Sequence, residues 1–361
     1  MAAAGPAAGI SAIFCHHKSP FMGVYHYLMW QKEFGNRLNK KCGFLDKYKG
    51  LDVSYNESTE YIFVLGGENM ETRWLYTTSE NFPVLVEESQ GVCVIPMGCV
   101  EKHGLHLPLG TDNIHSERLA YMASQLEHVC VFPQFYFGDV CEGWSSMPAG
   151  TITLPVDTEM LLLEQLCEQI SRNGFKKIVI YNGHGGNNLW LPAFLRRTQN
   201  KKKDYVVMVV FCSLTAPHGL AEKILAEGPE VFPEMSKEDV ELVLKYHEEK
   251  MRIGHACFGE TAYLMGIAPE SVKLDRLGIE AGIDLGITKE YSKKGITLAS
   301  GGCMINNPMC YYGDDPIGCN ERIGAAALRM EAERVADVFK FIKEDNTVVD
   351  AYREFWELDK E

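Results

Sequence analysis

An apolar run leads directly into a dense polar segment at residues 92–112, which read VCVIPMGCVEKHGLHLPLGTD. A second run of the same kind ends in the polar segment NGHGGN at residues 182–187. In open sheets of parallel strands, ligands bind at the carboxyl ends of the strands, so two such segments can meet at one edge. Their carboxylates and imidazoles are ligands that borderline and hard divalent ions prefer. The two segments therefore predict halves of one metal site.

The remaining apolar runs indicate an α/β fold. Short runs at residues 92–96, 129–132, 178–181 and 206–211 are typical of strands that are covered on both faces. Helical patterns lie between these runs. The alternation predicts a parallel sheet with right-handed crossovers.

Capping residues predict where several helices begin and end. Asp157 and Thr158 are suited to cap a helix that ends at Gly174. Ser236 starts another helix with a pattern much like a capping box. A last long helix is expected from about residue 320 to residue 344.

The composition is that of a globular protein that does not bind nucleic acid. The 361 residues are 46% hydrophobic and 23% charged, and the formal net charge of -14 opposes contact with nucleic acid or an anionic membrane. No stretch has the apolar length of a membrane helix, and no basic residue precedes the apolar N-terminal run. The 12 cysteines are scattered without a CxxC pair, which predicts reduced thiols in a cytoplasmic protein.

Ionisable side chains near predicted strand and helix ends are candidate metal ligands. Glu101 and His103 are two residues apart, so in an extended segment both side chains leave on the same side. Asp112 comes at a helix start, where its carboxylate is suited to bridge two ions that together activate a water molecule. The segment HACFGET at residues 255–261 offers a second carboxylate and a histidine that can move protons. The candidate ligands are Glu101, His103, Asp112, His184 and Glu260.

Structural alternatives exist for each of these segments. Asp112 could simply cap the helix that follows it, and a single histidine after a strand is often structural. The segment at residues 182–187 could be a phosphate-binding loop, although it lacks the lysine of a P-loop and the spacing of a dinucleotide fingerprint. Burying so many ionisable groups without partners is costly, which favours the metal site.

Together these segments resemble the creatininase family, which comprises metal-dependent creatinine amidohydrolases and their relatives. The family pattern is similar to residues 96–112, to residues 182–187, and to the His-Ala and Glu-Thr pairs within residues 255–261. The segment GDDP at residues 313–316, before the closing helix, also looks like the family's. The resemblance covers roughly residues 73–343. It implies a three-layer α/β/α domain with a mostly parallel sheet, assembled into homo-oligomers such as hexamers.

The resemblance also implies a dinuclear metal centre. Family members carry two divalent ions, typically zinc, manganese or iron. Position by position, Glu101 and His184 would hold one ion. His103 and Glu260 would hold the other, with Asp112 as the bridge between the two.

Two departures from the family pattern concern the site. Creatininases proper have a glutamate ligand where this chain has Gly186, and for this reason the resemblance assigns that role to Glu260. A histidine often found before the family's Phe-Pro-Gly-Thr-Ile segment is missing from residues 142–152, so creatinine itself is not the expected substrate. Trp144 in this loop is either a ring-stacking wall or a core residue. The expected substrate contacts are Trp144, His106, Gly185 and Gly186.

Three parts of the chain are expected. Residues 1–72 form an aromatic N-terminal extension that packs on the core or on a neighbouring subunit. Residues 73–345 form the metallohydrolase domain, and residues 346–361 form a C-terminal tail.

These expectations favour hydrolysis of a small, cyclic substrate by a metal-activated hydroxide that attacks a carbonyl. The bond broken would be the C–N bond of an amide or lactam, with His255 as the catalytic proton shuttle. One alternative is hydrolytic C–C ring cleavage of an oxidised inositol, as in relatives that look like the 3-dehydro-scyllosose hydrolases. Another is a non-catalytic metal-binding assembly or sensor module. The expected partner is a small molecule, with no nucleic acid and no membrane.

Overall fold

The computed structural model describes residues 71–140, 148–280, 282–298 and 303–358. The predicted N-terminal extension therefore lies outside the described residues, except for its last two positions. Trp144 also lies outside them. Within the described residues, no helix combines the length and the apolar character needed to cross a bilayer.

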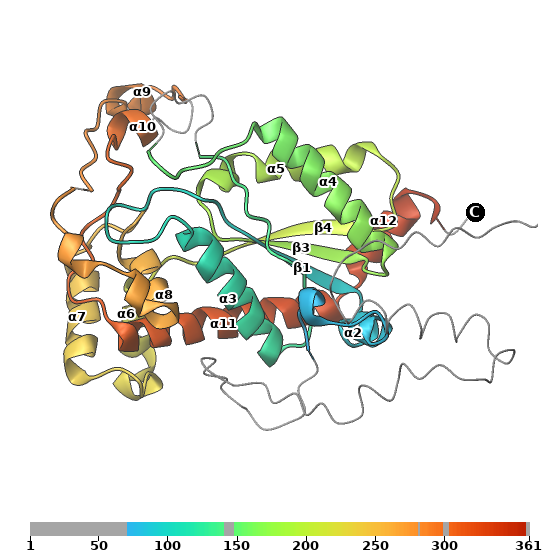
Figure 1. Cartoon of the computed structure of the whole chain (residues 1–361), viewed down its shortest axis with the longest axis horizontal. Coiled ribbons are helices and arrows are strands. Elements are labelled where there is room, and N and C mark those ends of the chain that lie inside the picture. The colour runs from blue at the N-terminus through green and yellow to red at the C-terminus, as the bar shows by residue number, and fades with distance from the viewer. Residues whose placement is uncertain (1–70, 141–147, 281, 299–302, 359–361) are drawn as a thin grey trace, which may run out of the picture. The chain divides into compact units, whose positions relative to one another are not determined.

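Four parallel strands form the sheet of the described residues, in the order β2-β1-β3-β4 (Figure 1). The bounds of the strands are β1 Val92–Met97, β2 Cys130–Val131, β3 Lys177–Asn182 and β4 Val206–Phe211. Each contains or lies within one of the four predicted apolar runs, so the predicted strands and their parallel pairing are confirmed. Strands β1 and β3 are buried along their whole length, as expected of a sheet covered on both faces.

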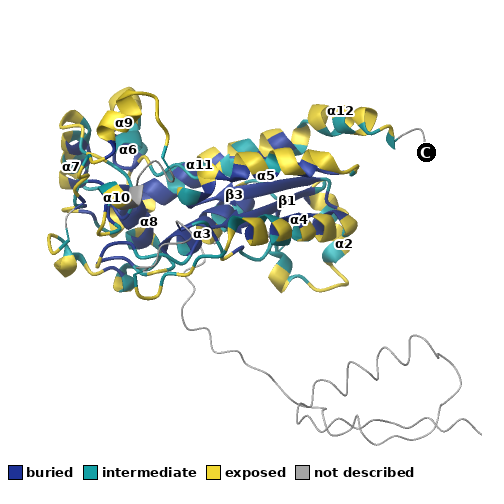
Figure 2. Cartoon of the chain, turned by 90° about the horizontal axis from the view of Figure 1, so that it is seen from above, coloured by how far each residue is buried: buried dark blue, intermediate teal, exposed yellow. Residues whose placement is uncertain are grey.

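Helices cover both faces of this sheet (Figures 1 and 2). Successive strand residues point to opposite faces, and on β1 the side chains of Val92 and Val94 belong to one apolar core, whereas Cys93 and Ile95 belong to the other. The first core includes residues of α3 (Thr111–Leu126) and α11 (Glu321–Glu344). The second includes residues of α2 (Phe82–Glu88), α4 (Val156–Arg172) and α5 (Leu191–Arg197). The predicted three-layer α/β/α domain is confirmed.

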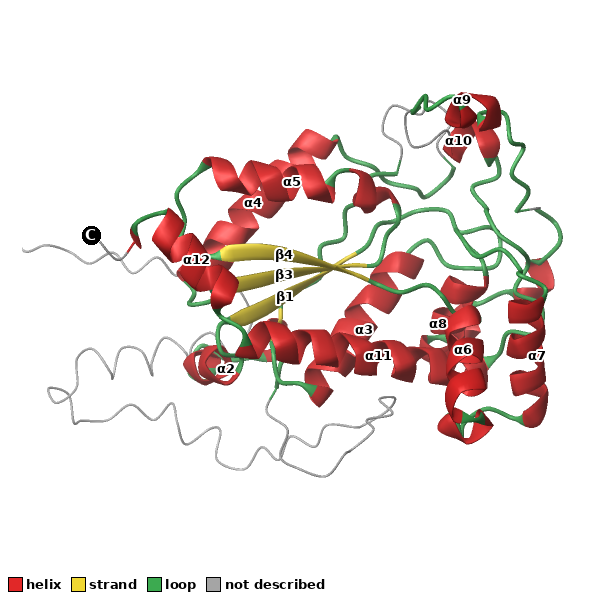
Figure 3. Ribbon diagram, turned by 180° about the vertical axis from the view of Figure 1, so that it is seen from behind, coloured by secondary structure: helices red, strands yellow, loops and turns green. Residues whose placement is uncertain are grey.

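A further group of helices lies beyond the carboxyl ends of the strands, and α12 lies toward the opposite end (Figure 3). The bounds of the remaining helices are α6 His218–Glu227, α7 Lys237–Glu248, α8 Phe258–Ile267, α9 Lys289–Lys293, α10 Cys303–Asn306 and α12 Thr347–Phe355. Short 3-10 helices connect these elements at η2 Trp74–Tyr76, η3 Gly186–Leu189, η4 Thr198–Asn200, η5 Pro229–Val231, η6 Pro269–Ser271 and η7 Leu274–Arg276.

The predicted helix ends are confirmed except at one helix start. Ser236 forms a complete capping box with Asp239, and the side chain of Asn320 caps α11. Gly174, with φ +108, follows the end of α4 as expected. The prediction that Asp157 and Thr158 cap α4 was wrong, because α4 already begins at Val156 and has no side-chain cap. Asp157 instead lies in the first turn, where a negative charge interacts favourably with the helix dipole.

Candidate metal centre

Three segments that are distant in the sequence bring ionisable side chains to the carboxyl edge of the sheet. Strand β1 leads into the loop with Glu101, and the next strand, β3, leads into the loop with His184. The two loops start side by side, because Met97 pairs with Asn182 at the ends of these strands. The first turns of α3 and α8 add Asp112 and Glu260. Ligand atoms lie within 4.8 Å of one another in three groups: Cys99, Glu101, Asp112 and His184; Glu101, His103 and His255; and His103, Asp112 and Glu260.

Asp112 lies at the centre of this cluster and is only 1% exposed. Its Oδ2 is 2.7 Å from Nδ1 of His184, and its Oδ1 is 3.1 Å from Nε2 of His103. Helix α3 begins at Thr111 after Gly110 and has no side-chain cap, so the alternative in which Asp112 merely caps the helix is wrong. The two oxygens of one carboxylate instead face two different imidazoles. This placement suits a bridge between two ions.

The orientation of both imidazoles is fixed by backbone carbonyls. Nε2 of His184 donates a hydrogen bond of 2.9 Å to the carbonyl oxygen of Asp139. Nδ1 of His103 donates one of 3.0 Å to the carbonyl oxygen of Glu101. In each ring the other nitrogen is the one that faces Asp112. Metal-binding histidines characteristically donate their second ring nitrogen in this way, which fixes the tautomer and the ring plane.

The charges of the cluster fit divalent cations. Glu101, Asp112 and Glu260 form ion pairs only with histidines among the described residues, and no lysine or arginine neutralises them. Burial alone would lower the pKa of both imidazoles. The carboxylates outweigh this effect and raise the pKa of His103 to about 10 and that of His184 to about 9. The cluster therefore attracts positive charge, and its nitrogen and oxygen donors match zinc, manganese and iron.

Glu101 and His255 form the more accessible side of the cluster. Their side chains are 15% and 22% exposed, whereas that of His103 is fully buried. Nε2 of His255 donates a hydrogen bond of 2.8 Å to the carbonyl oxygen of Lys102, so Nδ1 is turned toward Glu101, 3.9 Å from its Oε2. The ring of His255 lies 4.2 Å from that of His103. A molecule that reaches the cluster from solvent meets His255 at its edge.

The turn before α8 joins the histidine and the carboxylate of the third predicted segment. Ala256 has φ +60, a left-handed conformation that costs an alanine about 1–2 kcal/mol. Its backbone N–H donates to the Glu260 carboxylate. Glu260 Oε2 lies 3.7 Å from Nε2 of His103. The strained turn therefore lets His255 and Glu260 approach the same cluster from positions five residues apart.

Gly186 explains why a glutamate is absent from the loop after β3. A Cβ atom there would lie 2.1 Å from the carbonyl oxygen of Asp139 and 2.5 Å from Nε2 of His184. It would break the hydrogen bond that orients His184, so this conformation of the loop excludes every side chain at position 186. Gly185, in contrast, has nothing within 4 Å of the Cβ position and borders open space. A substrate contact from either glycine stays a prediction.

His106 is not brought into the metal cluster. It is 2% exposed, its Nε2 lies 3.2 Å from Oγ1 of Thr261, and its ring lies 5.6 Å from that of Tyr311. Burial lowers the pKa of His106 to about 4, so it is a neutral side chain. This environment favours a role in positioning Thr261 and the start of α8, and nothing in it supports the predicted substrate contact.

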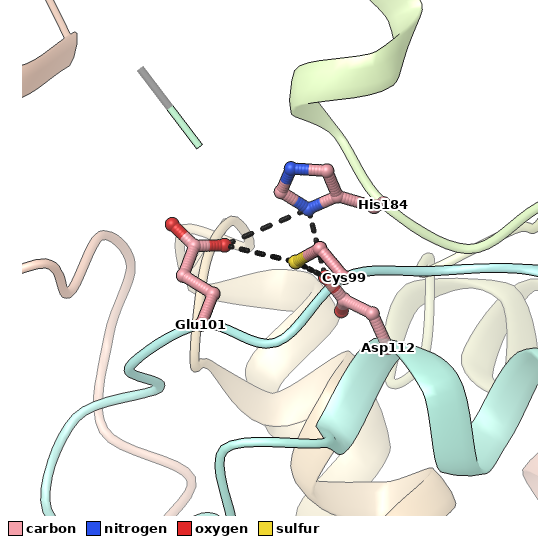
Figure 4. A group of neighbouring side chains, drawn as sticks. All are labelled: Cys99, Glu101, Asp112 and His184. Atoms are coloured by element: carbon pink, nitrogen blue, oxygen red, sulfur yellow. Dashed lines mark hydrogen bonds and ion pairs between the residues drawn. The ribbon is translucent and has the colours of Figure 1, made fainter. Parts of the chain in front are cut away.

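Two residues that the sequence analysis missed also approach Asp112. The Sγ atom of Cys99 is 3.1 Å from Oδ2 of Asp112 and points into the group formed with Glu101 and His184 (Figure 4). Nε2 of His115 is 3.5 Å from Oδ1 of Asp112. Their spacing in the sequence could have predicted both contacts. Cys99 is two residues before Glu101 in an extended segment, and His115 is one helical turn after Asp112.

Known proteins similar to this chain are creatininases. The family model described as creatinine amidohydrolase matches residues 76–339. The creatinine amidohydrolase of Pseudomonas putida is 22% identical over 118 residues, which span 32% of this chain and 45% of that enzyme. This match therefore includes less than half of the curated relative.

Solved structures agree on the fold. A candidate creatinine amidohydrolase from Bacteroides fragilis has a TM-score of 0.53 at 21% identity, over 71% of this chain and 90% of that one. A creatininase structure has a TM-score of 0.55 at 16% identity, over 77% of this chain and 100% of that one. Other similar creatininase structures are described as a Zn-Zn form and a manganese form. At these identities the structures show a shared fold, whereas the family match extends over well more than half of the sequence: this chain belongs to the creatininase family.

Proposed function

We propose that this chain is a metal-dependent hydrolase that cleaves a C–N bond of a small, cyclic amide. The observation that carries the proposal is the placement of Asp112, whose two carboxylate oxygens each face an imidazole with its other nitrogen bound to a backbone carbonyl. A buried carboxylate between two such imidazoles suits a pair of cations. The family match and the names of the similar enzymes support amide hydrolysis over other reactions of such centres.

Five residues would hold two divalent ions. Glu101 and His184 would bind one ion, His103 and Glu260 would bind the other, and Asp112 would bind both. When bound, such ions lower the pKa of a water molecule and polarise a carbonyl oxygen. Zinc and manganese are favoured because similar creatininase structures are described in zinc and manganese forms, and iron matches the same donors.

His255 would be the catalytic proton carrier. The Lys102 carbonyl holds its Nε2 proton, which leaves Nδ1 at the exposed edge of the cluster to accept and return a proton. A leaving nitrogen needs such a proton before it departs as an amine, and general acid catalysis of this kind contributes about 10²–10⁴-fold.

The experiment compares metal content and substrate range in the full-length protein. Metal is measured by plasma mass spectrometry, and hydrolysis is assayed on cyclic amides, formamides and oxidised inositols with Zn²⁺, Mn²⁺ or Fe²⁺. We expect about two ions per chain and turnover of a cyclic amide. If only oxidised inositols were hydrolysed, the proposed C–N cleavage would be wrong and C–C ring cleavage would take its place as the proposed reaction. A folded protein that binds no metal would overturn the proposal.

Substitution of His255 tests its role separately. We expect His255→Gln to lower turnover by about 10²-fold or more while the metal content stays that of the wild type. His218→Gln is the matched control, because His218 is also partly buried and also binds a backbone carbonyl, that of Met251, outside the cluster. Equal turnover of the two variants would exclude His255 as the proton carrier. Light scattering on the same samples tests the expected homo-oligomer, for which we propose a hexamer.

A further inference from the structure

We propose that Cys99 is a sulfur ligand of the metal position formed by Glu101 and His184. The inference rests on the proposed function, because it requires an ion at this position. It goes beyond the five predicted ligands and makes the two metal positions chemically different. One would offer sulfur, nitrogen and oxygen donors, and the other only nitrogen and oxygen.

The ligand atoms of the four side chains already lie within 4.8 Å of one another (Figure 4). Sγ of Cys99 lies 3.6 Å from Oε2 of Glu101 and 3.1 Å from Oδ2 of Asp112. Nδ1 of His184 lies 3.6 Å from the same Glu101 oxygen and 2.7 Å from the same Asp112 oxygen. Tetrahedral bonds of 2.0–2.3 Å separate ligand atoms by about 3.3–3.8 Å, and all four separations fall in this range or within about 0.6 Å of it. Small side-chain adjustments therefore suffice to surround one ion.

The backbone holds Cys99 in this position. The amide of Asn113 donates a hydrogen bond of 2.7 Å to the carbonyl oxygen of Cys99. The preceding residue, Gly98, packs so closely on the start of α3 that a Cβ there would lie 2.6 Å from the backbone nitrogen of Asn113. Position 99 is thus tied to the same helix turn that presents Asp112. A thiol on a backbone fixed in this way needs only a small side-chain adjustment to bind an ion.

The surroundings of the thiol suit a ligand better than a core side chain. Cys99 is 0% exposed, yet its sulfur faces two carboxylates. An ion that enters displaces the thiol proton, which leaves to solvent as the metal–sulfur bond forms. The cation then satisfies both carboxylates and the sulfur at once, whereas a thiol can donate its one proton to only one of them.

A sulfur ligand changes which metal this position prefers. Thiolate favours zinc over the harder manganese ion, whereas imidazole and carboxylate accept both. The Glu101–His184 position would therefore select zinc or iron. The His103–Glu260 position, without a sulfur, would accept manganese more readily.

Cobalt is the probe that reports sulfur binding directly. The full-length protein is loaded with Co²⁺ alone, the bound cobalt is counted by plasma mass spectrometry, and the absorption spectrum is recorded. A cobalt–thiolate bond gives a near-ultraviolet charge-transfer band that nitrogen and oxygen ligands do not give. We expect this band in the wild type and its loss in Cys99→Ser and Cys99→Ala. Cys167→Ala, which removes a buried thiol from the core on the α4 face of the sheet, should keep the band.

Competition between metals provides a second measurement that does not depend on turnover. Removal of a residue that only hydrogen-bonds to a metal ligand lowers metal affinity by about 10–100-fold, and removal of a ligand should cost at least as much. We expect Cys99→Ser to weaken Zn²⁺ relative to Mn²⁺ by at least about tenfold. Serine keeps a hydroxyl that can donate to Asp112, so a purely hydrogen-bonding role would leave this ratio unchanged in Cys99→Ser and alter it only in Cys99→Ala.

The outcomes separate this inference from the proposed function. Cobalt bound without the charge-transfer band, or with a band that survives in Cys99→Ser, would overturn the sulfur ligand and leave the metal centre intact. A folded wild-type protein that binds no cobalt would overturn both. Circular dichroism establishes that each variant is folded before its spectrum is compared.

Discussion

Among the described residues, charged side chains gather at both ends of the sheet, but those at the carboxyl end include carboxylates with no lysine or arginine partner. Near the amino ends of the strands, Asp204 pairs with Lys176, and Glu164 pairs with Lys201. The lysine side chains there are 40% and 66% exposed. At the carboxyl ends, Glu101 and the other carboxylates of the metal cluster form ion pairs only with histidines among the described residues.

This difference teaches what the carboxyl edge is built to bind. A carboxylate that meets a lysine in contact with water is neutralised at little cost, and nothing further is needed. A buried carboxylate without a partner costs several kcal/mol. Histidine can serve as its partner in two ways, because the imidazole either carries a proton or gives it up and binds a metal ion. Lysine in the same place would compete with the metal instead of holding it.

The largest effect should come from the acid that both metal positions share. Asp112→Asn removes a negative charge from between His103 and His184, so we expect both ions and measurable turnover to be lost. The measurement is metal content by plasma mass spectrometry, together with turnover of the substrate found in the panel. The loss should exceed the roughly 10–100-fold fall in metal affinity or activity that follows removal of a residue that only hydrogen-bonds to a metal ligand.

Asp204→Asn is the matched control, because it makes the same change at the other end of the sheet. Asp204 faces Lys176, so its replacement should leave the metal content unchanged. If Asp112→Asn kept both ions, or if Asp204→Asn lost them, the contrast between the two ends of the sheet would fail.

An intermediate effect is expected from the carboxylate that faces only one metal position. Glu260→Gln keeps the shape of the side chain but removes the charge 3.7 Å from Nε2 of His103. We expect the metal content to fall from about two ions per chain to about one, with loss of turnover. Glu164→Gln tests a carboxylate of similar burial that pairs with lysine and arginine, and it should keep both ions. A Glu260→Gln protein that still holds two ions would remove Glu260 from the ligand set.

Much of the fold and the location of the site could be predicted from the sequence. The four strands could be predicted from the length and apolar composition of their segments, because strands covered on both faces are nearly continuous apolar runs. The position of Glu101 and His184 after neighbouring strands then followed from the parallel topology. The start of α4 could not be placed in this way, because the chain enters that helix at Val156, after Pro155, and uses no side-chain cap.

The roles that the sequence did not reveal are those that depend on contacts between segments distant in the chain. Cysteine after an apolar run reads as a core residue, and only the approach of Cys99 to Asp112 distinguishes it from one. His106 presents the opposite case: its sequence context predicts a substrate contact, which stays a prediction, whereas the fold places it against Thr261. Each depends on how α3 and α8 dock against the loop after β1, which no local pattern encodes.

A smaller effect should appear in the pH dependence of stability. In the metal-free protein the pKa values of His103 and His184 are about 10 and about 9, above the value of about 6.5 in an unfolded chain. Protonated imidazoles therefore stabilise the fold fully below about pH 6.5, and this stabilisation is lost as the pH rises through about 9 to 10. We expect the melting temperature of the chelator-treated protein to fall over this range.

Bound metal should weaken this dependence, because the cation replaces the protons. The comparison is a series of melting curves at several pH values, with EDTA and with Zn²⁺. Asp204 does not contribute in this window: Lys176 outweighs the effect of burial and lowers the pKa of Asp204, so its stabilisation is lost only in acid. Equal slopes with and without Zn²⁺ would mean that the histidines of the cluster do not exchange protons for metal.

The smallest effect is expected for the ion pair at the amino end of the sheet. The side chains of Lys176 and Asp204 are 40% and 51% exposed, so water and salt screen their attraction. A double-mutant cycle with Lys176→Ala and Asp204→Ala, measured by urea unfolding, should give a coupling energy of about 0.2–1 kcal/mol. That energy should decrease further in about 1 M salt, where the screening length is about 3 Å. A coupling of about 3–5 kcal/mol, which is typical of breaking a buried pair, would mean that this end depends on charge pairing as strongly as a buried site does. The two ends of the sheet would then differ only in whether a carboxylate faces a lysine or a histidine. The difference in burial between the two sets of carboxylates would no longer explain the contrast.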